Sequence, residues 1–238
     1  EADLESHGVG TLYTNDGHDC MGYIAQDDAW AESILDRQKR NVIRDKNQSA
    51  VIFWSLGNES GYGGNFEDAG RWVKAYDSTR LLHYEASIYD SAGYHNDVSM
   101  LDVMSRMYAD TEWVKEYCED RRMRKPFIQC EFIHAMGNGP GDIHDYMELM
   151  YKYDKFCGGF VWEWCDHATW EGKAADGRDI FHYGGDAGEF PHDGNFCMDG
   201  LVYPDRRPHT GLLEFKNINR PVRITGYDET NGVLTLHN

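Results

Sequence analysis

Residues 51–61 read VIFWSLGNESG, an apolar run that ends abruptly in Asn58 and Glu59 before a glycine-bearing loop. A second stretch, PFIQCEFIHAMGN at residues 126–138, carries Glu131 at the end of its apolar run in the same way. Strands of a parallel barrel are buried on both faces, so they read as continuous apolar runs, and functional groups lie where the strands end. The two stretches therefore predict barrel strands that present Glu59 and Glu131 at the C-terminal rim.

Strand-like and helix-like segments alternate along the chain. Helices are predicted over 26–46, 66–76, 112–122 and 142–153, and strands over 50–56, 81–84, 101–107, 127–130 and 158–164. This spacing is typical of βα units, so the predicted class is α/β with a parallel sheet. A (β/α)8 barrel typically needs about 250 residues. Besides the predicted strands, the chain offers only a short stub at residues 1–5. We therefore expect a TIM barrel that lacks its first strands, within a fragment of a larger protein.

The sequence changes character near its C-terminal end. Asn231-Gly232 lies between two β-prone runs, 222–224 and 233–236, and such a dipeptide is the strongest short signal for a hairpin. We expect the barrel over residues 1–214. Residues 215–238 are then expected to form a linker and the first strands of a following β-sandwich domain.

Composition excludes some functions and leaves others open. The net charge of −18 disfavours nucleic-acid binding, and no apolar stretch approaches the ~18 residues that a membrane span needs. The six cysteines are scattered without C-x-x-C spacing, which favours buried free thiols in a reducing cytoplasm, with disulfides left open.

Two carboxylates that face one cleft are the minimum equipment for cleaving a glycosidic bond. Glu59 could protonate the leaving oxygen while the amide of Asn58 binds a sugar hydroxyl. The alternative is that residues 58–60 only cap the next helix. Glu131 could act as a nucleophile, which must be ionised and rigidly held, or it could form a structural ion pair at a strand end.

Further residues are weaker candidates for the same site. Glu5 and His7 point to the same side of an extended segment, so with a third ligand they could hold Mg²⁺ or Zn²⁺. Trp162 ends the apolar run at 158–164 and could be a platform for a sugar ring or a core residue. Tyr108 follows a predicted strand and could hydrogen-bond the nucleophile.

Together these motifs resemble the large bacterial β-galactosidases of glycoside hydrolase family 2. The resemblance covers nearly the whole chain and is carried, in order, by residues 3–8, 54–61, 130–138, 159–164, 183–186, 196–202 and 207–209. It implies retaining hydrolysis of terminal β-D-galactose residues in galactosides such as lactose. Another family 2 glycosidase, a transglycosylating β-galactosidase and an inactive fragment are the alternatives.

The resemblance also implies a role for individual positions. Glu59 would be the acid/base and Glu131 the nucleophile. Mg²⁺ would be held by Glu5, His7 and Glu59, and the galactose subsite would be lined by Asn58, Tyr108, His134 and Trp162. Na⁺ would lie at the Phe196 carbonyl and at Asp199, which stands where the family pattern has an asparagine. The parent protein is expected to be a cytoplasmic bacterial homo-oligomer.

Overall fold

The computed structural model describes residues 1, 6, 18–89 and 94–238, with the side chains of 18–21 left aside. Glu5 and His7, two of the three predicted Mg²⁺ ligands, lie outside these residues, as do residues 2–5 of the stub predicted at 1–5. The chain forms two compact units. The first contains Glu1–Ala109, Glu116–Cys130 and Asp154–Gly158, and the second contains Asp110–Lys115, Glu131–Tyr153 and Gly159–Asn238.

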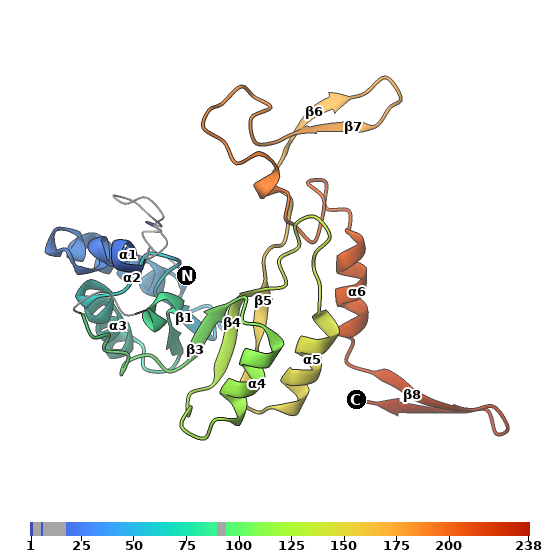
Figure 1. The fold of residues 1–238 in the computed structure, drawn as a ribbon, viewed down its shortest axis with the longest axis horizontal. Coiled ribbons are helices and arrows are strands. Elements are labelled where there is room, and N and C mark those ends of the chain that lie inside the picture. Colours follow the sequence, from blue (N-terminus) through green and yellow to red (C-terminus); the bar gives the residue numbers. More distant parts are fainter. Residues whose placement is uncertain (2–5, 7–17, 90–93) are drawn as a thin grey trace. The chain divides into compact units, whose positions relative to one another are not determined.

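The first unit is built around a βαβ arrangement (Figure 1). Its elements are α1 (His18–Gln26), η1 (Asp28–Trp30), α2 (Ala31–Asp45), β1 (Phe53–Ser55), α3 (Gly64–Tyr76), β2 (Leu81–His83) and η2 (Glu85–Ile88). β1 and β2 are parallel, with Phe53 opposite Leu81. Apolar side chains of both strands and of α2 and α3 form one core, which includes Ile34, Val42, Trp54, Leu56, Phe66, Val73 and Leu82.

A three-stranded sheet follows, in the order β3 (Met104–Met107), β4 (Phe127–Phe132), β5 (Phe156–Val161). The intervening helices are α4 (Thr111–Glu119) and α5 (Ile143–Lys152). The remaining elements are β6 (Thr169–Lys173), β7 (Asp179–His182), η3 (Gly194–Cys197), α6 (Thr210–Ile218), β8 (Arg223–Asp228) and β9 (Val233–His237). The alternation of strands and helices confirms the α/β class, while the described strands do not close into a complete barrel.

Each strand and helix predicted between residues 26 and 164 is present, with shifted ends. The helix predicted over 26–46 is interrupted at Asp27, whose side chain accepts the Ala29 N–H at 3.0 Å and caps the short 3-10 helix η1 before α2 begins. The strand predicted over 158–164 begins and ends earlier, as β5. The sequence prediction missed α1, α6 and the hairpin β6–β7.

The hairpin predicted around Asn231-Gly232 is confirmed. β8 and β9 pair antiparallel, Asp228 lies opposite Val233, and Gly232 takes the left-handed conformation that such a turn requires (φ 64°). Apolar side chains on both strands are exposed, among them Ile224, Leu234 and Leu236. That this hairpin begins a β-sandwich stays a prediction.

The cysteines whose side chains are described form no disulfide with one another, and they are not all buried. Cys118 and Cys165 are buried, Cys130 and Cys197 are half-buried, and Cys157 is exposed.

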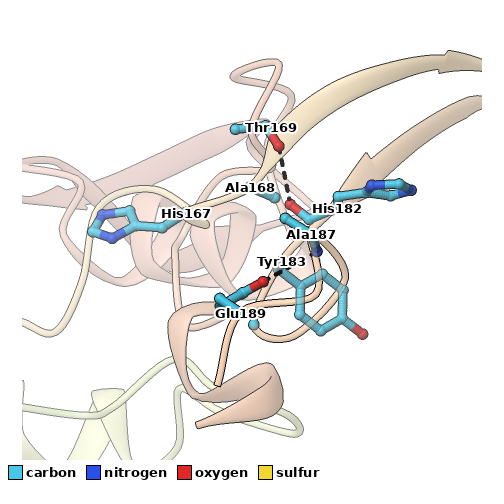
Figure 2. Close-up of a pocket in the computed structure, with 8 residues that line it drawn as sticks. His167, Ala168, Thr169, His182, Tyr183, Ala187 and Glu189 are labelled. Carbon is cyan, nitrogen blue, oxygen red and sulfur yellow. Dashed lines mark hydrogen bonds between the residues drawn. The ribbon is translucent and has the colours of Figure 1, made fainter. Parts of the chain in front are cut away.

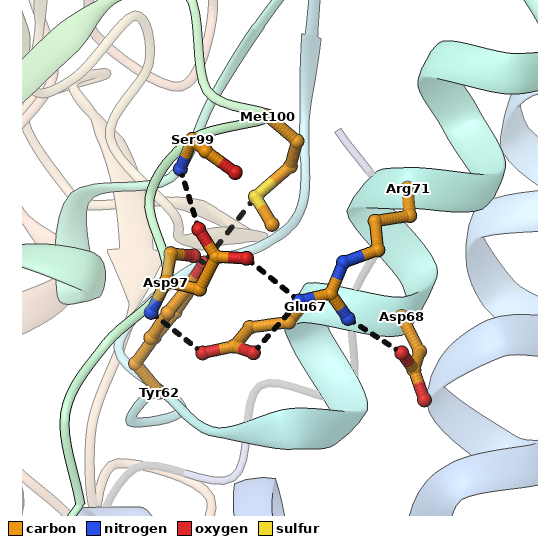
Figure 3. Close-up of polar contacts among 7 residues, drawn as sticks. All are labelled: Tyr62, Glu67, Asp68, Arg71, Asp97, Ser99 and Met100. Atoms are coloured by element: carbon orange, nitrogen blue, oxygen red, sulfur yellow. Dashed lines mark hydrogen bonds and ion pairs between the residues drawn. The ribbon is translucent and has the colours of Figure 1, made fainter.

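A polar network around Arg71 anchors the segment before β3 to α3 (Figure 3). The Arg71 guanidinium donates to Asp97 Oδ2 at 2.7 Å, Asp68 Oδ1 at 2.7 Å and Glu67 Oε2 at 3.2 Å. Glu67 is buried and accepts the Asp97 N–H at 2.8 Å, while the Tyr62 hydroxyl donates to the Asp97 carbonyl at 2.7 Å. This network fixes the chain between β2 and β3 against a helix.

Candidate active site

In the first unit, Asn58 and Glu59 form a tight turn after β1. Glu59 is half-buried and has a left-handed backbone (φ 42°). The Ser60 N–H donates to the Tyr84 hydroxyl at 3.1 Å, and the Ser60 hydroxyl donates to the Asn58 carbonyl at 2.8 Å. The next helix begins at Gly64 with Gly63 as its N-cap residue, so the alternative that residues 58–60 cap that helix is wrong.

Tyr108 follows β3 and also has a left-handed backbone (φ 49°), with 43% of its surface exposed. The next residue, Ala109, is held by hydrogen bonds to the side chain of Gln129 on β4. Gln129 is fully buried. Gln129 Oε1 accepts the Ala109 N–H at 2.8 Å, and Gln129 Nε2 donates to the Ala109 carbonyl at 2.9 Å. A buried amide therefore holds the turn that presents Tyr108.

Glu85 is a further candidate site residue that the sequence prediction missed. It follows β2, is 4% exposed, and receives a hydrogen bond from the Tyr89 hydroxyl at 3.3 Å. Burial raises its pKa to about 7, and the negative charge of Glu59 adds to the rise. The sequence feature that could have revealed Glu85 is the largely apolar segment 81–84, which is followed by a glutamate. The stretches that carry Glu59 and Glu131 have the same form.

In the second unit, Glu131 lies on β4, and Ile133 takes a left-handed backbone (φ 45°) before His134. The Met136 N–H donates to His134 Nδ1 at 3.3 Å, so in the neutral ring Nε2 carries the proton. The Ala135 N–H donates to the Trp162 carbonyl at 2.8 Å. This bond joins the segment after β4 to the segment after β5.

Asp199 holds several candidate residues of the second unit in place. It is 2% exposed, and its Oδ2 accepts the Trp162 Nε1–H at 3.1 Å and lies 3.7 Å from His134 Nε2. The Phe196 ring lies 6.0 Å from the His134 ring. An open pocket of about 310 Å³ is lined by Trp162, Glu163, His167, Gly184, Asp193, Gly194, Phe196, Cys197 and Asp199. We call it the Trp162 pocket.

Glu163 is the second candidate site residue that the sequence prediction missed. Its pKa is raised to about 7, first by burial, then by the contact with Asp199 and by the negative charges of Asp166 and Glu131. His167 Nε2 lies 3.4 Å from Glu163 Oε1. Glu131 is therefore close enough to the Trp162 pocket for its charge to act on a residue of the lining.

The second unit thus brings together His134, Trp162, Phe196 and Asp199, all predicted from the sequence. Oδ1 of Asp199 is buried and has no hydrogen-bond partner. A buried carboxylate oxygen of this kind is a suitable ligand for a hard cation such as Na⁺. Within residues 18–89 and 94–238, the Asp199 surroundings included, no cluster of three or more His, Cys, Asp or Glu side chains could hold a metal ion.

No helix in the described part of the chain has the length and apolarity to cross a membrane.

Comparison with known proteins identifies the family. The model of the glycosyl hydrolases family 2 TIM barrel domain matches residues 1–224. A beta-galactosidase of Actinobacillus pleuropneumoniae is 49% identical over 259 residues, covering 100% of this chain and 25% of its own length. A beta-galactosidase of Staphylococcus xylosus is 47% identical over 235 residues, covering 98% of this chain and 24% of its own length. The chain spans about a quarter of the length of these relatives.

Solved structures agree at the level of the fold. The crystal structure of Ruminococcus gnavus beta-glucuronidase in complex with uronic isofagomine matches with a TM-score of 0.52 and 17% identity, over 79% of this chain and 35% of that chain. Because the identity is so low, this likeness concerns the fold alone. The matched family model and the two close relatives establish that the chain belongs to glycoside hydrolase family 2 and carries its TIM barrel domain.

Proposed function

We propose that the chain is the catalytic part of a retaining β-galactosidase. The observation that carries the proposal is that two proteins named beta-galactosidase share 49% and 47% identity with essentially the whole chain. Its predicted site residues also fall at the ends of β1, β3, β4 and β5, where a barrel of this family presents its chemistry.

Glu131 attacks the anomeric carbon of the galactosyl unit while Glu59 donates its proton to the glycosidic oxygen, which leaves with the aglycone. The products of this step are a galactosyl ester on Glu131 and an ionised Glu59. Glu59 then takes a proton from water, whose oxygen attacks the same carbon and releases galactose with its original configuration. In a retaining enzyme the two carboxyl groups lie about 5–5.5 Å apart.

Asn58, Tyr108, His134 and Trp162 form the galactose subsite in this proposal. The Trp162 indole is fixed by its hydrogen bond to Asp199, yet 38% of the residue is exposed, so part of it is available for contact with a sugar. His134 is oriented by the Met136 N–H, which leaves its Nε2 as a hydrogen-bond donor.

Two cations belong to the proposal. Mg²⁺ would be held by Glu5, His7 and Glu59, and a cation there would fix the Glu59 carboxyl and stabilise its anionic form. Na⁺ would be held by the Phe196 carbonyl and Asp199, and the unpaired buried Oδ1 of Asp199 supports that site.

The finer architecture is also part of the proposal. Residues 1–214 would form a TIM barrel that lacks its first strands, and 215–238 would begin a β-sandwich. We propose that the whole protein is a homo-oligomer in the bacterial cytoplasm.

A panel of nitrophenyl glycosides tests the activity in the full-length protein with Mg²⁺. The β-galactoside should be hydrolysed with a kcat/KM at least about tenfold above that of the β-glucuronide, β-mannoside and β-fucoside, which corresponds to about 1.4 kcal/mol of discrimination. Preference for any of the other three would overturn the galactosidase proposal and leave the family assignment intact.

A further inference from the structure

Asp166 and His209 form a hydrogen-bonded pair in the second unit that the proposed mechanism does not use. Asp166 is 4% exposed, and its Oδ2 lies 2.8 Å from His209 Nε2. Because an ionised carboxylate only accepts hydrogen bonds, His209 Nε2 carries the proton of this bond. A buried carboxylate is costly unless it is hydrogen-bonded, so both oxygens of Asp166 need partners.

The other oxygen of Asp166 holds the backbone beside Asp199. Asp166 Oδ1 accepts the Gly200 N–H at 2.8 Å in a buried hydrogen bond. A Cβ placed on Gly200 would collide with the backbone of Cys165 and Asp166, so the two segments are in direct main-chain contact at this point. One carboxylate oxygen is thus bound to His209 and the other to the residue that follows Asp199.

Main-chain hydrogen bonds run along the same two segments. The Glu163 N–H donates to the Asp199 carbonyl at 3.0 Å, and the Leu201 N–H donates to the Glu163 carbonyl at 2.9 Å. The Asp166 N–H donates to the Val202 carbonyl at 3.0 Å. The Asp166 carboxylate therefore adds a side-chain hydrogen bond to a ladder that already includes the main chain of Asp199.

His209 is itself held by its neighbours. Its ring stacks on the Tyr203 ring, with 3.8 Å between the ring centroids and 25° between the planes. The His209 N–H donates to the Leu201 carbonyl at 3.0 Å. The Arg207 guanidinium lies 5.2 Å from the centre of the Tyr203 ring. A donor that is fixed in this way keeps the carboxylate of Asp166 in one orientation.

Asp199 connects this arrangement to the proposed galactose subsite. Its Oδ2 accepts the Trp162 Nε1–H at 3.1 Å, and the same oxygen lies 3.7 Å from His134 Nε2. A shift of Gly200 would displace the adjoining main chain of Asp199, and the indole that is bonded to the Asp199 side chain would follow. The orientation of Trp162 therefore depends on the hydrogen bond between Asp166 and Gly200.

The β6–β7 hairpin that follows Asp166 has hydrogen bonds of its own. Figure 2 shows the base of this hairpin, where the Thr169 hydroxyl donates to the His182 carbonyl at 3.5 Å. Its two strands pair antiparallel. Neither interaction involves the carboxylate of Asp166, which is bound to Gly200 and His209. The effect of the pair is therefore expected in the segment that contains Gly200, and not in the hairpin.

From these contacts we infer that Asp166 and His209 are positioning residues for the galactose subsite. They hold the main chain at Gly200 and Asp199, and through Asp199 they orient the Trp162 indole. The inference rests on the proposed function and deepens it, since it assigns the alignment of the sugar platform to two residues that do not touch the sugar.

Steady-state kinetics of the full-length protein on a nitrophenyl β-galactoside test the inference. Asp166→Ala removes both hydrogen bonds of the carboxylate. It should raise KM about three- to tenfold and leave kcat within about twofold, because a sugar platform contacts the substrate before and during the reaction alike. Asp166→Asn can accept the Gly200 N–H and donate to the other tautomer of His209, so its KM should stay within about twofold of the wild-type value.

Asp176→Ala is the matched control. Asp176 lies in the turn of the β6–β7 hairpin, its side chain is 51% exposed, and it accepts the Arg178 Nε–H at 2.7 Å. Its loss should leave both kinetic constants unchanged.

A double-mutant cycle with Trp162→Phe separates positioning from a general loss of stability. Phenylalanine lacks the N–H that binds Asp199, so adding Asp166→Ala to Trp162→Phe should raise KM by less than about twofold. Should Asp166→Ala fail to fold, His209→Phe takes its place in the cycle. It keeps a ring that can stack on Tyr203 but removes the donor to Asp166, and it should raise KM about threefold.

Effects on KM that multiply in the double variant would overturn the inference, because they would show that the pair does not act through Trp162. An Asp166→Asn variant as impaired as Asp166→Ala, a loss confined to kcat, or a KM that neither Asp166→Ala nor His209→Phe raises would overturn it as well. A wild-type protein that does not cleave the galactoside would instead refute the proposed function, and the inference with it.

Discussion

Three residues that follow the ends of site strands have left-handed backbones: Glu59, Tyr108 and Ile133. This conformation is unusual for residues other than glycine, and for a β-branched residue such as Ile133 it is a clear outlier. Each costs on the order of 1–3 kcal/mol and persists only where neighbouring contacts impose it. The Tyr84 hydroxyl and the Gln129 amide, which hold the residues after Glu59 and Tyr108, are contacts of this kind. Strain is thus concentrated where the proposed chemistry takes place.

Glu85 makes stability depend on pH. Its pKa is about 7 in the folded chain and near 4.5 when unfolded. Between these values the folded state retains a proton that the unfolded state has lost, so Glu85 weakens folding as the pH rises, by up to about 1.4 kcal/mol per pH unit. The free energy of unfolding of Glu85→Gln, relative to that of the wild type, should therefore increase between pH 5 and pH 8.

Urea denaturation at the two pH values measures this difference. Glu116→Gln, which changes an exposed carboxyl on α4, is the control and should show no such trend. A Glu85→Gln variant that is equally destabilised at both pH values would show that the carboxyl is not held protonated by burial.

At the scale of the elements, the sequence predicted the helices and strands whose apolar residues have a clear pattern. β1 and β4 appear as apolar runs because most of their residues are buried, and α2 and α3 appear as helical stripes because one face of each helix is buried. β6 and β7 were missed because both faces of that hairpin are largely exposed, which leaves no pattern to detect. The Asp176-Gly177 dipeptide at its turn was a usable signal. Glu85 and Glu163 were missed because their raised pKa values depend on burial and on neighbours distant in sequence, such as Asp199 for Glu163.

The turn between α3 and β2 is tied to β1 by Asp77. This buried carboxylate accepts the Trp54 indole N–H at 3.0 Å, the Thr79 N–H at 3.0 Å and an Arg80 N–H at 2.6 Å. These hydrogen bonds outweigh the opposing effect of burial and hold the Asp77 pKa well below its usual value. Asp77 therefore stabilises the fold above the pKa of the unfolded state, and the contribution is lost as the pH falls towards the lower, folded value.

Asp77→Asn should lower the free energy of unfolding by about 3–5 kcal/mol at pH 7, the usual cost of removing one partner from a buried ion pair, and by less at pH 3. Asp68→Asn on α3 is the control, since 77% of its side chain is exposed and a surface ion pair contributes about 1 kcal/mol or less. Equal losses for the two variants at pH 7 would contradict the role of Asp77.

At the scale of the whole molecule, the proposed acid and nucleophile belong to different units of the chain. Glu59 lies in the first and Glu131 in the second. The sequence could predict both because each follows or ends an apolar run, and their pairing stays a proposal. Their roles, however, depend on how a complete barrel brings the strand ends together, which no single sequence motif specifies.

Rescue by azide in the full-length protein tests these two roles most directly. Without its nucleophile, Glu131→Ala can use azide to displace an activated leaving group from β-galactosyl fluoride in one step, which gives the inverted α-galactosyl azide. Without its acid/base, Glu59→Ala still forms the galactosyl ester from a nitrophenyl β-galactoside, and azide then displaces Glu131, which gives the retained β-galactosyl azide. Proton NMR of the products distinguishes the two anomers. The account predicts α for Glu131→Ala and β for Glu59→Ala, and the reverse assignment or the same anomer from both variants would contradict it.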